Sequence, residues 1–278
     1  MNEIGQEHPT IEQTRIIEAM EANFAEEMAC MARALPGGDL HENAEMSWFF
    51  TGRPGFNGVL RTVINSTDKT YIDARISEVL AYFQERKVEI GWPVGPLAQP
   101  GNLTMYLESH GLRYRSSHYP MVLDMLTRWG QVNIHVPGLN IEEIVDYETL
   151  KLWRSLSVRG FESSEEVGQT YYEAYYRAGF GDGYPWHHYI AWLHEQPVAI
   201  ASLLLHAGVA GLYGITTHPD VRRKGIGTAI TTYLLHEAQR FGFRIAILSP
   251  SEMGVNIYRR LGFQEYYKTD FYLWTPNS

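Results

Sequence analysis

The sequence predicts an α/β fold in which mixed, mostly antiparallel sheets are flanked by helices. Three observations support this prediction. Apolar strands alternate with amphipathic helices from about residue 131 onward. A basic turn with two glycines joins one of these strands to a helix, at residues 217–228. The first half of the chain faintly repeats the order of helix, strand, short helix and aromatic strand that is found in the second half.

Composition and charge exclude several classes of protein. The chain has 278 residues, of which 45% are hydrophobic, so it can bury one large core or two moderate ones. A net charge of −9 argues against broad nucleic-acid binding, and no apolar run approaches the roughly 18 residues that cross a membrane. Cys30 is the only cysteine, which rules out an internal disulfide. The polar, acidic first residues do not have the pattern of a secretory signal, so we expect a soluble, cytoplasmic protein.

The elements of the second half are expected in the following order. We predict strands at residues 131–136, 188–194, 197–206 and 208–217, and helices at residues 141–156 and 162–177. The helix at 226–240 carries Ile226, Ile230 and Leu234 at helical spacing, so one of its faces should pack on a sheet. A strand at 243–249, a short helix after Val255 and an aromatic strand at 266–274 complete this half.

The turn at residues 217–228 has the chemistry of a phosphate-binding site. The first turn of a helix has backbone N–H groups without a partner and carries the positive end of the helix dipole, so an anion is stabilised there. Gly225 and Gly227 let the backbone approach a ligand closely. Three basic residues add positive charge: Arg222, Arg223 and Lys224. Taken alone, the spacing Arg-x-x-Gly-x-Gly is more often an ordinary capped loop.

Two motifs in sequence order resemble the signature of the GNAT superfamily of acyl-CoA-dependent N-acyltransferases. That signature is Arg/Gln-x-x-Gly-x-Gly/Ala followed by Asn-x-x-Tyr-x-x-x-Gly-Phe or a close variant. The chain contains Arg222-Arg223-Lys224-Gly225-Ile226-Gly227 and, downstream, Asn256-Ile257-Tyr258-Arg259-Arg260-Leu261-Gly262-Phe263. The resemblance covers about the C-terminal half. Together with the internal repeat it implies a tandem GNAT-like fold, with acetyl-CoA as co-substrate and no metal.

The resemblance implies a role for each matched residue. The CoA pyrophosphate would be bound by Arg222, Arg223, Lys224, Gly225, Ile226, Gly227 and Thr228. Asn256 would hydrogen-bond the pantetheine arm, and backbone N–H groups at Ile215 and Thr217 would polarise the thioester carbonyl. Gly214 would mark a bulge that splays the strands to admit pantetheine, or else serve only packing.

Tyr258 is the expected general acid. In the family, the amine attacks the thioester directly and the tyrosine protonates the departing thiolate. A free phenol has a pKa of about 10, so it is protonated at neutral pH and can donate. A tyrosine that fills core volume is the alternative interpretation of this residue.

The sequence departs from the family pattern at the general base. Many members carry a glutamate on the strand that enters the phosphate-binding turn, but residues 208–217 contain no carboxylate, and the matching position lies near Gly211. His188, Glu252 and a water chain are the open candidates for the proton acceptor.

Clusters of histidine and tyrosine invite other interpretations. His187, His188, His194 and His206 have no zinc-ligand spacing, so we expect no metal site. Spacing of four residues places Tyr171 beside Tyr175 and Tyr172 beside Tyr176, which favours core packing over pocket lining. The loop at 179–186 could meet a cationic amine through Asp182, Tyr184 and Trp186, although an ordinary surface loop fits it better.

The first half resembles a degenerate copy of the same fold. Before its helix, residues 65–70 contain no glycine pair and one basic residue, so this copy should bind no pyrophosphate. Leu107 stands where the second copy has Tyr258, with Tyr106 one residue away. We therefore predict a non-catalytic domain at 1–129 and a catalytic acyl-CoA-binding domain at 130–278. The first domain would support the second, and its aromatic segment at 48–57 could also contact the acceptor.

The expected function is N-acetyl transfer from acetyl-CoA to a primary amine of a small molecule by direct attack. A non-catalytic acyl-CoA sensor or assembly module, and an enzyme with a longer acyl donor, are the alternatives. The expected partner is the small-molecule amine, with no nucleic acid and no membrane. The chain would act as a monomer or a homodimer.

Overall fold

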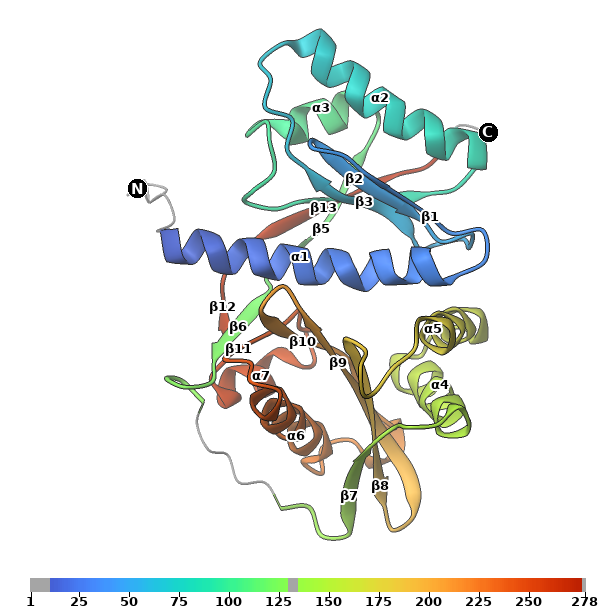
Figure 1. The fold of residues 1–278 in the computed structure, drawn as a ribbon, viewed down its shortest axis with the longest axis vertical. Helices are drawn as coiled ribbons and strands as arrows, with labels where there is room; N and C mark the ends of the chain where they lie inside the picture. The colour runs from blue at the N-terminus through green and yellow to red at the C-terminus, as the bar shows by residue number, and fades with distance from the viewer. Residues whose placement is uncertain (1–10, 130–134, 277–278) are drawn as a thin grey trace.

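The computed structural model describes residues 11–129 and 135–276 as two stacked sheets with a long helix between them (Figure 1). Within these residues one sheet has six strands and the other has seven. Most strand pairs are antiparallel, and helices flank both sheets. The predicted mixed, mostly antiparallel α/β architecture is confirmed.

The described part of the first half contains three helices and six strands, and the first of these elements is a long helix. These elements are α1 (Ile11–Ala34), β1 (Asp39–Glu42), β2 (Met46–Phe50), β3 (Asn57–Thr62), α2 (Lys69–Arg86), β4 (Ile90–Val94), α3 (Leu103–Ser109), β5 (Arg113–His118) and β6 (Met121–Asp124).

The second half alternates strands and helices more regularly. Its described elements are β7 (Leu139–Glu143), α4 (Tyr147–Phe161), α5 (Glu165–Ala178), β8 (Trp186–Leu193), β9 (Gln196–His206), β10 (Val209–Thr217), the 3-10 turn η1 (Pro219–Val221), α6 (Ile226–Arg240), β11 (Ile245–Leu248), α7 (Val255–Leu261), β12 (Gln264–Glu265) and β13 (Thr269–Trp274). The predicted helix at 226–240 has the same bounds as α6.

The two sheets exchange one strand each. The first sheet has the order β1-β2-β3-β4-β13-β5, so the last strand of the chain lies inside the sheet of the first half. The second sheet has the order β12-β6-β11-β10-β9-β8-β7, so β6 of the first half lies between two strands of the second. Tyr272 of β13 is opposite Trp92 and Tyr114, and Val122 of β6 is opposite Ile247 and Gln264.

This exchange corrects the expected domain boundary. A single division between residues 129 and 130 places β6 in the first domain and β13 in the second, whereas each strand pairs in the opposite sheet. The reason is that the last strand of each half forms its hydrogen bonds with the other half. The two units are therefore interleaved, and we describe them by their sheets.

The start of the second half also differs from expectation. Residues 131–134, where a strand was predicted, lie outside the described residues. The predicted helix at 141–156 is wrong at its beginning, because Leu139–Glu143 is strand β7, paired with β8. Helix α4 begins only after Asp146, whose side chain accepts a hydrogen bond from the Thr149 N–H at 2.8 Å. An N-terminal cap thus outweighs the apolar spacing of the preceding residues.

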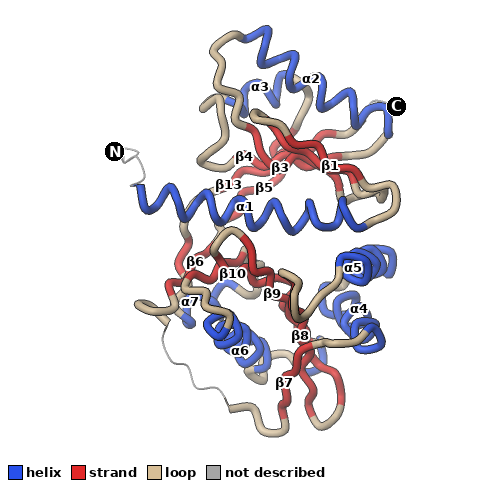
Figure 2. The backbone as a smooth tube through the Cα atoms, in the orientation of Figure 1, coloured by secondary structure: helices blue, strands red, loops and turns tan. Residues whose placement is uncertain are grey.

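Helices cover both faces of the second sheet (Figure 2). On one face, α6 and α7 pack over a core that includes Leu212, Ile230 and Tyr258. On the other face, α4 and α5 contribute Trp153 and Tyr175 to a second core, which includes Ile190 of the sheet. Helices α2 and α3 pack on the first sheet around the buried Trp92. Helix α1 contacts β1, β2 and β3 of the first sheet, and β9, β10 and α5 of the second, so it joins the two units.

Candidate active site

Strand β10 diverges from its parallel neighbour β11 partway along its length. The two strands pair only at Ala210 with Ala246 and at Gly211 with Ile247, although β10 continues to Thr217. On its other side, the register of β10 with β9 shifts between Tyr213 and Thr216. Gly214, inside this bulge, has φ 58°, a left-handed conformation that glycine adopts without strain. The bulge predicted at Gly214 is confirmed, and the strands open beside Ile215 and Thr217.

The turn after β10 presents an uncapped helix N-terminus. Gly225 is the N-cap of α6 with φ 84°, and no side chain bonds the first N–H groups of the helix. Arg223 is also left-handed, with φ 66°. A Cβ placed on Gly227 would lie 3.8 Å from the Thr217 Oγ1 and 3.8 Å from the Ile257 Cδ1. The start of α6, the end of β10 and helix α7 therefore meet at one point, where free N–H groups can bind an anion.

The three basic side chains of the turn divide into two kinds. Arg222 donates from Nε to the Thr217 carbonyl at 3.2 Å and from Nη2 to the Gly160 carbonyl at 2.7 Å. It also lies 3.5 Å from the Glu162 carboxylate. Arg223 and Lys224 are exposed, and neither contacts a charged or polar partner among the described residues. Arg222 thus braces the turn against the end of α4, while its two neighbours are available to a phosphate.

Tyr258 lies on α7, next to the same turn. The residue is 9% exposed, shares a core with Ile226 and Leu212, and packs edge-on against Phe263 at 5.9 Å between ring centroids. Burial raises the pKa of its phenol to about 12, so the hydroxyl keeps its proton at neutral pH. None of the described residues hydrogen-bonds this hydroxyl, which leaves it able to donate to a ligand.

Asn256 lies two residues earlier on α7 and is exposed. A separation of two residues turns its side chain to a different part of the helix surface from that of Tyr258. The structure thus places the two residues on the same short helix, with Tyr258 facing the core and Asn256 facing outward.

The position that lacks a carboxylate is filled from the first half of the chain. A Cβ on Gly211 would lie 2.2 Å from the Asn23 Oδ1, so no side chain fits there unless the Asn23 amide moves. Asn23, on α1, is fully buried and accepts a hydrogen bond from the Tyr213 hydroxyl at 2.8 Å. Composition and periodicity gave no indication that residue 23 would lie beside residue 211. The available signal was the presence of a polar residue, Asn23, on the mostly apolar face of α1.

Neither side chain expected as a possible base has a favourable environment. His188 is fully buried, bonds the Ser202 hydroxyl through Nδ1 at 2.8 Å, and has its pKa lowered to about 3, mainly by burial. An imidazole with so low a pKa is a weak proton acceptor at neutral pH. Glu252 is exposed in the turn before α7.

The expected tyrosine pairs can be located as well. Tyr171 and Tyr175 lie 6.0 Å apart between ring centroids, as do Tyr172 and Tyr176. Over residues 11–129 and 135–276, no three His, Cys, Asp or Glu residues are grouped so as to hold a metal ion. In the loop at 179–186, Trp186 is buried at the start of β8, whereas Asp182 and Tyr184 are exposed.

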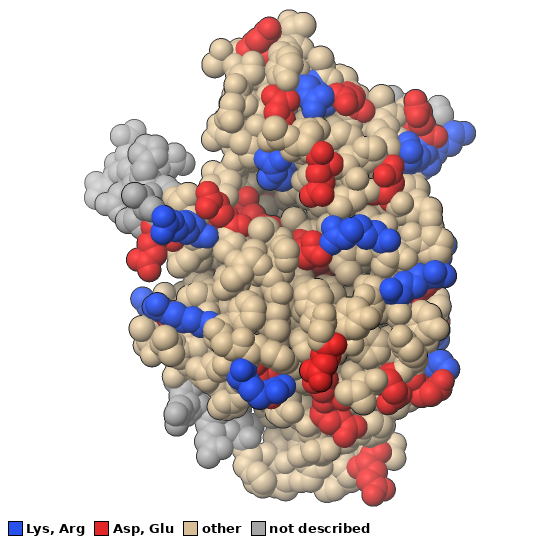
Figure 3. Space-filling view, viewed as in Figure 1, with Lys and Arg blue, Asp and Glu red and all other residues tan. Residues whose placement is uncertain are grey.

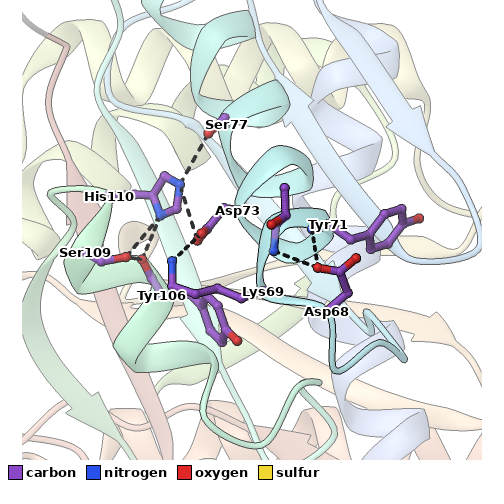
Figure 4. Close-up of polar contacts among 9 residues, drawn as sticks. Asp68, Lys69, Tyr71, Asp73, Ser77, Tyr106, Ser109 and His110 are labelled. Carbon is purple, nitrogen blue, oxygen red and sulfur yellow. Dashed lines mark hydrogen bonds and ion pairs between the residues drawn. The ribbon is translucent and has the colours of Figure 1, made fainter.

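The first half has no equivalent anion site. Helix α2 stands between parallel strands β3 and β4, as α6 stands between β10 and β11. The Asp68 side chain caps α2 by accepting from the backbone N–H groups of Thr70 at 2.9 Å and Tyr71 at 3.4 Å (Figure 4). Lys69 pairs with Asp73 at 2.5 Å. In α2, the Asp68 carboxylate thus bonds the N–H groups whose counterparts in α6 are free.

Surface charge and hydropathy add two facts. On the face drawn in Figure 3, acidic and basic side chains are interspersed over both units and do not form one basic patch. In the portion of the chain that the structure describes, no helix is both long and apolar enough to span a bilayer.

A diverging strand pair, an uncapped helix N-terminus and a tyrosine on the next helix are the structural features expected of a GNAT-like fold. The model of the Acetyltransferase (GNAT) family matches residues 150–263. Residues 150–263 are thus similar to this family of acetyltransferases. Comparison with curated proteins gave no match.

Solved structures share the architecture of nearly the whole chain. A GCN5-related N-acetyltransferase from Kribbella flavida has a TM-score of 0.71 and 17% identity, over 93% of this chain and 96% of that one. A tandem GNAT protein from the clavulanic acid biosynthesis pathway has a TM-score of 0.65 and 13% identity, over 97% of each chain. A GCN5-related N-acetyltransferase from Sphaerobacter thermophilus has a TM-score of 0.61 and 14% identity, over 85% and 82%. These likenesses show the tandem GNAT fold.

Proposed function

We propose that the protein transfers an acetyl group from acetyl-CoA to a primary amine of a small molecule by direct attack on the thioester. The observation that carries this proposal is the opening of β10 from β11 directly beside the uncapped N-terminus of α6. A thioester arm that enters between the two strands can bond to the free edge of β10. Its pyrophosphate then reaches the N–H groups of α6.

The residues of the site fit two separate tasks. In the binding task, Gly225, Ile226, Gly227 and Thr228 offer backbone N–H groups, while Arg223 and Lys224 offer positive charge. Arg222 holds the turn in place through the Gly160 and Thr217 carbonyls, and Asn256 is exposed to bind the pantetheine arm. Of the two helix N-termini that correspond to each other, α6 alone is open, because Asp68 caps α2 in the first half.

In the chemical task, the amine nitrogen attacks the thioester carbonyl carbon, and N–H groups of β10 near Ile215 and Thr217 stabilise the oxygen that becomes negative. The C–S bond then breaks, and the Tyr258 hydroxyl gives its proton to the departing thiolate. Burial raises the pKa of this phenol to about 12, so the hydroxyl is protonated at neutral pH and can donate a hydrogen bond and its proton as negative charge develops on the sulfur.

A free-thiol release assay tests the proposal. Wild-type protein is incubated with acetyl-CoA and a panel of amines, amino acids and aminated sugars, and Tyr258→Phe is run beside it. We expect turnover with one amine class, and a fall in kcat of about 100-fold in the variant with little change in acetyl-CoA affinity. Tyr119→Phe is the matched control, because Tyr119 is exposed outside the site and its loss should change neither quantity.

Two outcomes would contradict the proposal. Tight acetyl-CoA binding without turnover on any acceptor favours the sensor or assembly function. Turnover that is unchanged in Tyr258→Phe removes this residue from the chemistry.

A further inference from the structure

Helix α1 carries a side chain of the first half into the second. Asn23 fixes the helix there, because its Nδ2 donates to the carbonyls of Leu204, His206 and Val209 at 3.2, 3.1 and 3.3 Å. Glu27 follows Asn23 by four residues, so it lies on the same face of α1 one turn further on. This face contacts α5 and β10.

The surroundings of Glu27 are mainly aromatic. Phe24, on the same helix face, packs edge-on against Tyr213 at 6.1 Å, and Tyr213 lies 5.6 Å from Trp186 between ring centroids. Tyr175 of α5 lies 5.1 Å from Trp186. The Glu27 carboxylate forms no hydrogen bond and no ion pair with any described residue, whereas its neighbour Glu26 pairs with Arg33. A carboxylate held among aromatic rings without a cationic partner is costly unless a ligand supplies that partner.

Unused polar atoms on the same side of the sheet are an independent sign of a ligand. Trp153 Nε1 and His188 Nε2 are buried and have no hydrogen-bond partner among the described residues. Trp153 also faces the bulge, since a Cβ on Gly214 would lie 3.4 Å from its Cζ2. Tyr213, whose hydroxyl bonds Asn23, directly precedes Gly214. The cluster around Glu27 is thus continuous with the bulge at which β10 opens.

We propose that Glu27 binds the acceptor amine as its ammonium ion and accepts its proton, in place of the carboxylate that Gly211 cannot carry. This inference rests on the proposed function, and it assigns the substrate class as cationic primary amines. The ammonium gives one proton to the Glu27 carboxylate, and the resulting amine forms the C–N bond as the C–S bond breaks. Tyr258 protonates the thiolate, and the second amine proton restores the Tyr258 hydroxyl through solvent. The products are the amide, CoA thiol and one proton, which Glu27 releases.

The electrostatics of the cluster agree with this assignment. Burial raises the pKa of Glu27 to about 8. The facing tyrosines, Tyr171 and Tyr175 of α5 and Tyr213 of β10, have their pKa raised by burial and stay neutral, as does the Cys30 thiol. His188 of β8 has a lowered pKa and is also neutral at pH 7. Glu27 is therefore the group of this set that gains and loses its proton near neutral pH, where a general base is most effective.

The test is the pH profile of kcat/KM for the full chain with two amines of different pKa. In the wild type, kcat/KM should rise as pH passes about 8, because Glu27 must be ionised to accept a proton, and this rise should stay in place for both amines. In Glu27→Gln, we expect kcat/KM at pH 8 to fall by about 100-fold. The remaining rise should move with the pKa of each amine, since only the free amine can then react.

Glu21→Gln is the matched control. Glu21 lies on the same helix, and burial raises its pKa to about 7, but its environment includes Tyr267 and the Leu97 backbone rather than β10. The control should retain wild-type kcat/KM and pH profile. Acetyl-CoA affinity, measured by calorimetry, should be the same in all three proteins.

The outcomes separate this inference from the proposed function. Wild-type turnover with an unchanged profile in Glu27→Gln overturns the inference alone, and so does an equal loss in Glu21→Gln or a parallel loss of acetyl-CoA affinity. A wild type that acetylates no amine overturns the proposed function itself. If Glu27→Gln does not fold, the wild-type profile still decides the matter, because a rise that follows the pKa of each amine contradicts a base on the protein.

Discussion

At the scale of single residues, Asn23 joins the two halves through hydrogen bonds of both ends of its amide group. Its amide nitrogen donates hydrogen bonds to three carbonyls of the β9–β10 hairpin, and its amide oxygen accepts a hydrogen bond from the Tyr213 hydroxyl. The Asn23 amide is fully buried, as are its bonds to Leu204, Val209 and Tyr213, so these groups would lose their partner if the amide were removed. Asn23 therefore also holds Glu27, one turn away, against the second sheet.

Asn23→Ala should lower the free energy of unfolding by about 2–4 kcal/mol, since it leaves a buried hydroxyl and several buried carbonyls without partners. Urea denaturation followed by circular dichroism measures the change. Asn140→Ala is the control, because Asn140 is exposed and its side chain makes no hydrogen bond to the described residues. Equal stability of the two variants would contradict the anchoring role.

The sequence allowed only part of this site to be predicted. Tyr258 and Gly214 belong to local motifs, so their positions on α7 and in the β10 bulge could be expected. Asn23 and Glu27 act across nearly two hundred residues of sequence, as the separation of Asn23 from Tyr213 shows. Periodicity reports which face of a helix is buried but does not report which distant strand that face meets.

At the scale of elements, the turn before α6 requires glycine at position 225 more strongly than at position 227. Gly225 adopts φ 84°, which costs an L-residue about 1–2 kcal/mol. Gly227 lies inside the helix, and a Cβ there would make only ordinary contacts at 3.8 Å. The two glycines of the motif thus have different physical requirements.

Gly225→Ala should therefore weaken acetyl-CoA binding by about tenfold, because the strain of about 1–2 kcal/mol turns the N–H groups of α6 away from the bound geometry. Gly227→Ala should bind within a few-fold of the wild type. Calorimetric titration with acetyl-CoA gives both affinities, and it should report one bound molecule per chain. Equal weakening in both variants would show that backbone approach, rather than backbone conformation, decides binding.

Element boundaries were predicted well where a motif fixes them and poorly where apolar spacing is ambiguous. Helix α6 begins after a glycine turn, and its bounds agree with expectation. Strand β7 was taken for the start of a helix, because Ile141 and Ile144 are three residues apart, a spacing that fits a helical period. The capping role of Asp146 shows where the helix begins, but this capping bond is visible only in the structure.

At the scale of the whole molecule, the exchanged strands make each sheet depend on both halves. Strand β13 separates β4 from β5, so its removal leaves a gap inside the first sheet rather than a shortened edge. Removal of β6 likewise separates β11 from β12. No local pattern predicts the exchange, since an aromatic strand has the same alternation whichever sheet it joins.

Separate expression of residues 1–129 and 130–278 should therefore yield two poorly folded fragments, whereas the full chain should unfold in one cooperative transition. The reason is that each fragment carries a strand without its sheet and a sheet without its strand. Near-ultraviolet circular dichroism and size-exclusion chromatography of the fragments check the expectation. A fragment that is monomeric and natively packed by itself would contradict it. A full chain truncated after Asn277 is the control, because it ends beyond β13.

The place of β13 also determines when the molecule can be completed during translation. The ribosome makes the first half early, but the strand that fills its sheet is made only after the other described strands of both halves. Throughout elongation, β4 and β5 thus carry unpaired edges that other strands could join. A nascent chain that stalls before residue 269 releases a protein with both halves nearly whole and the first sheet still open.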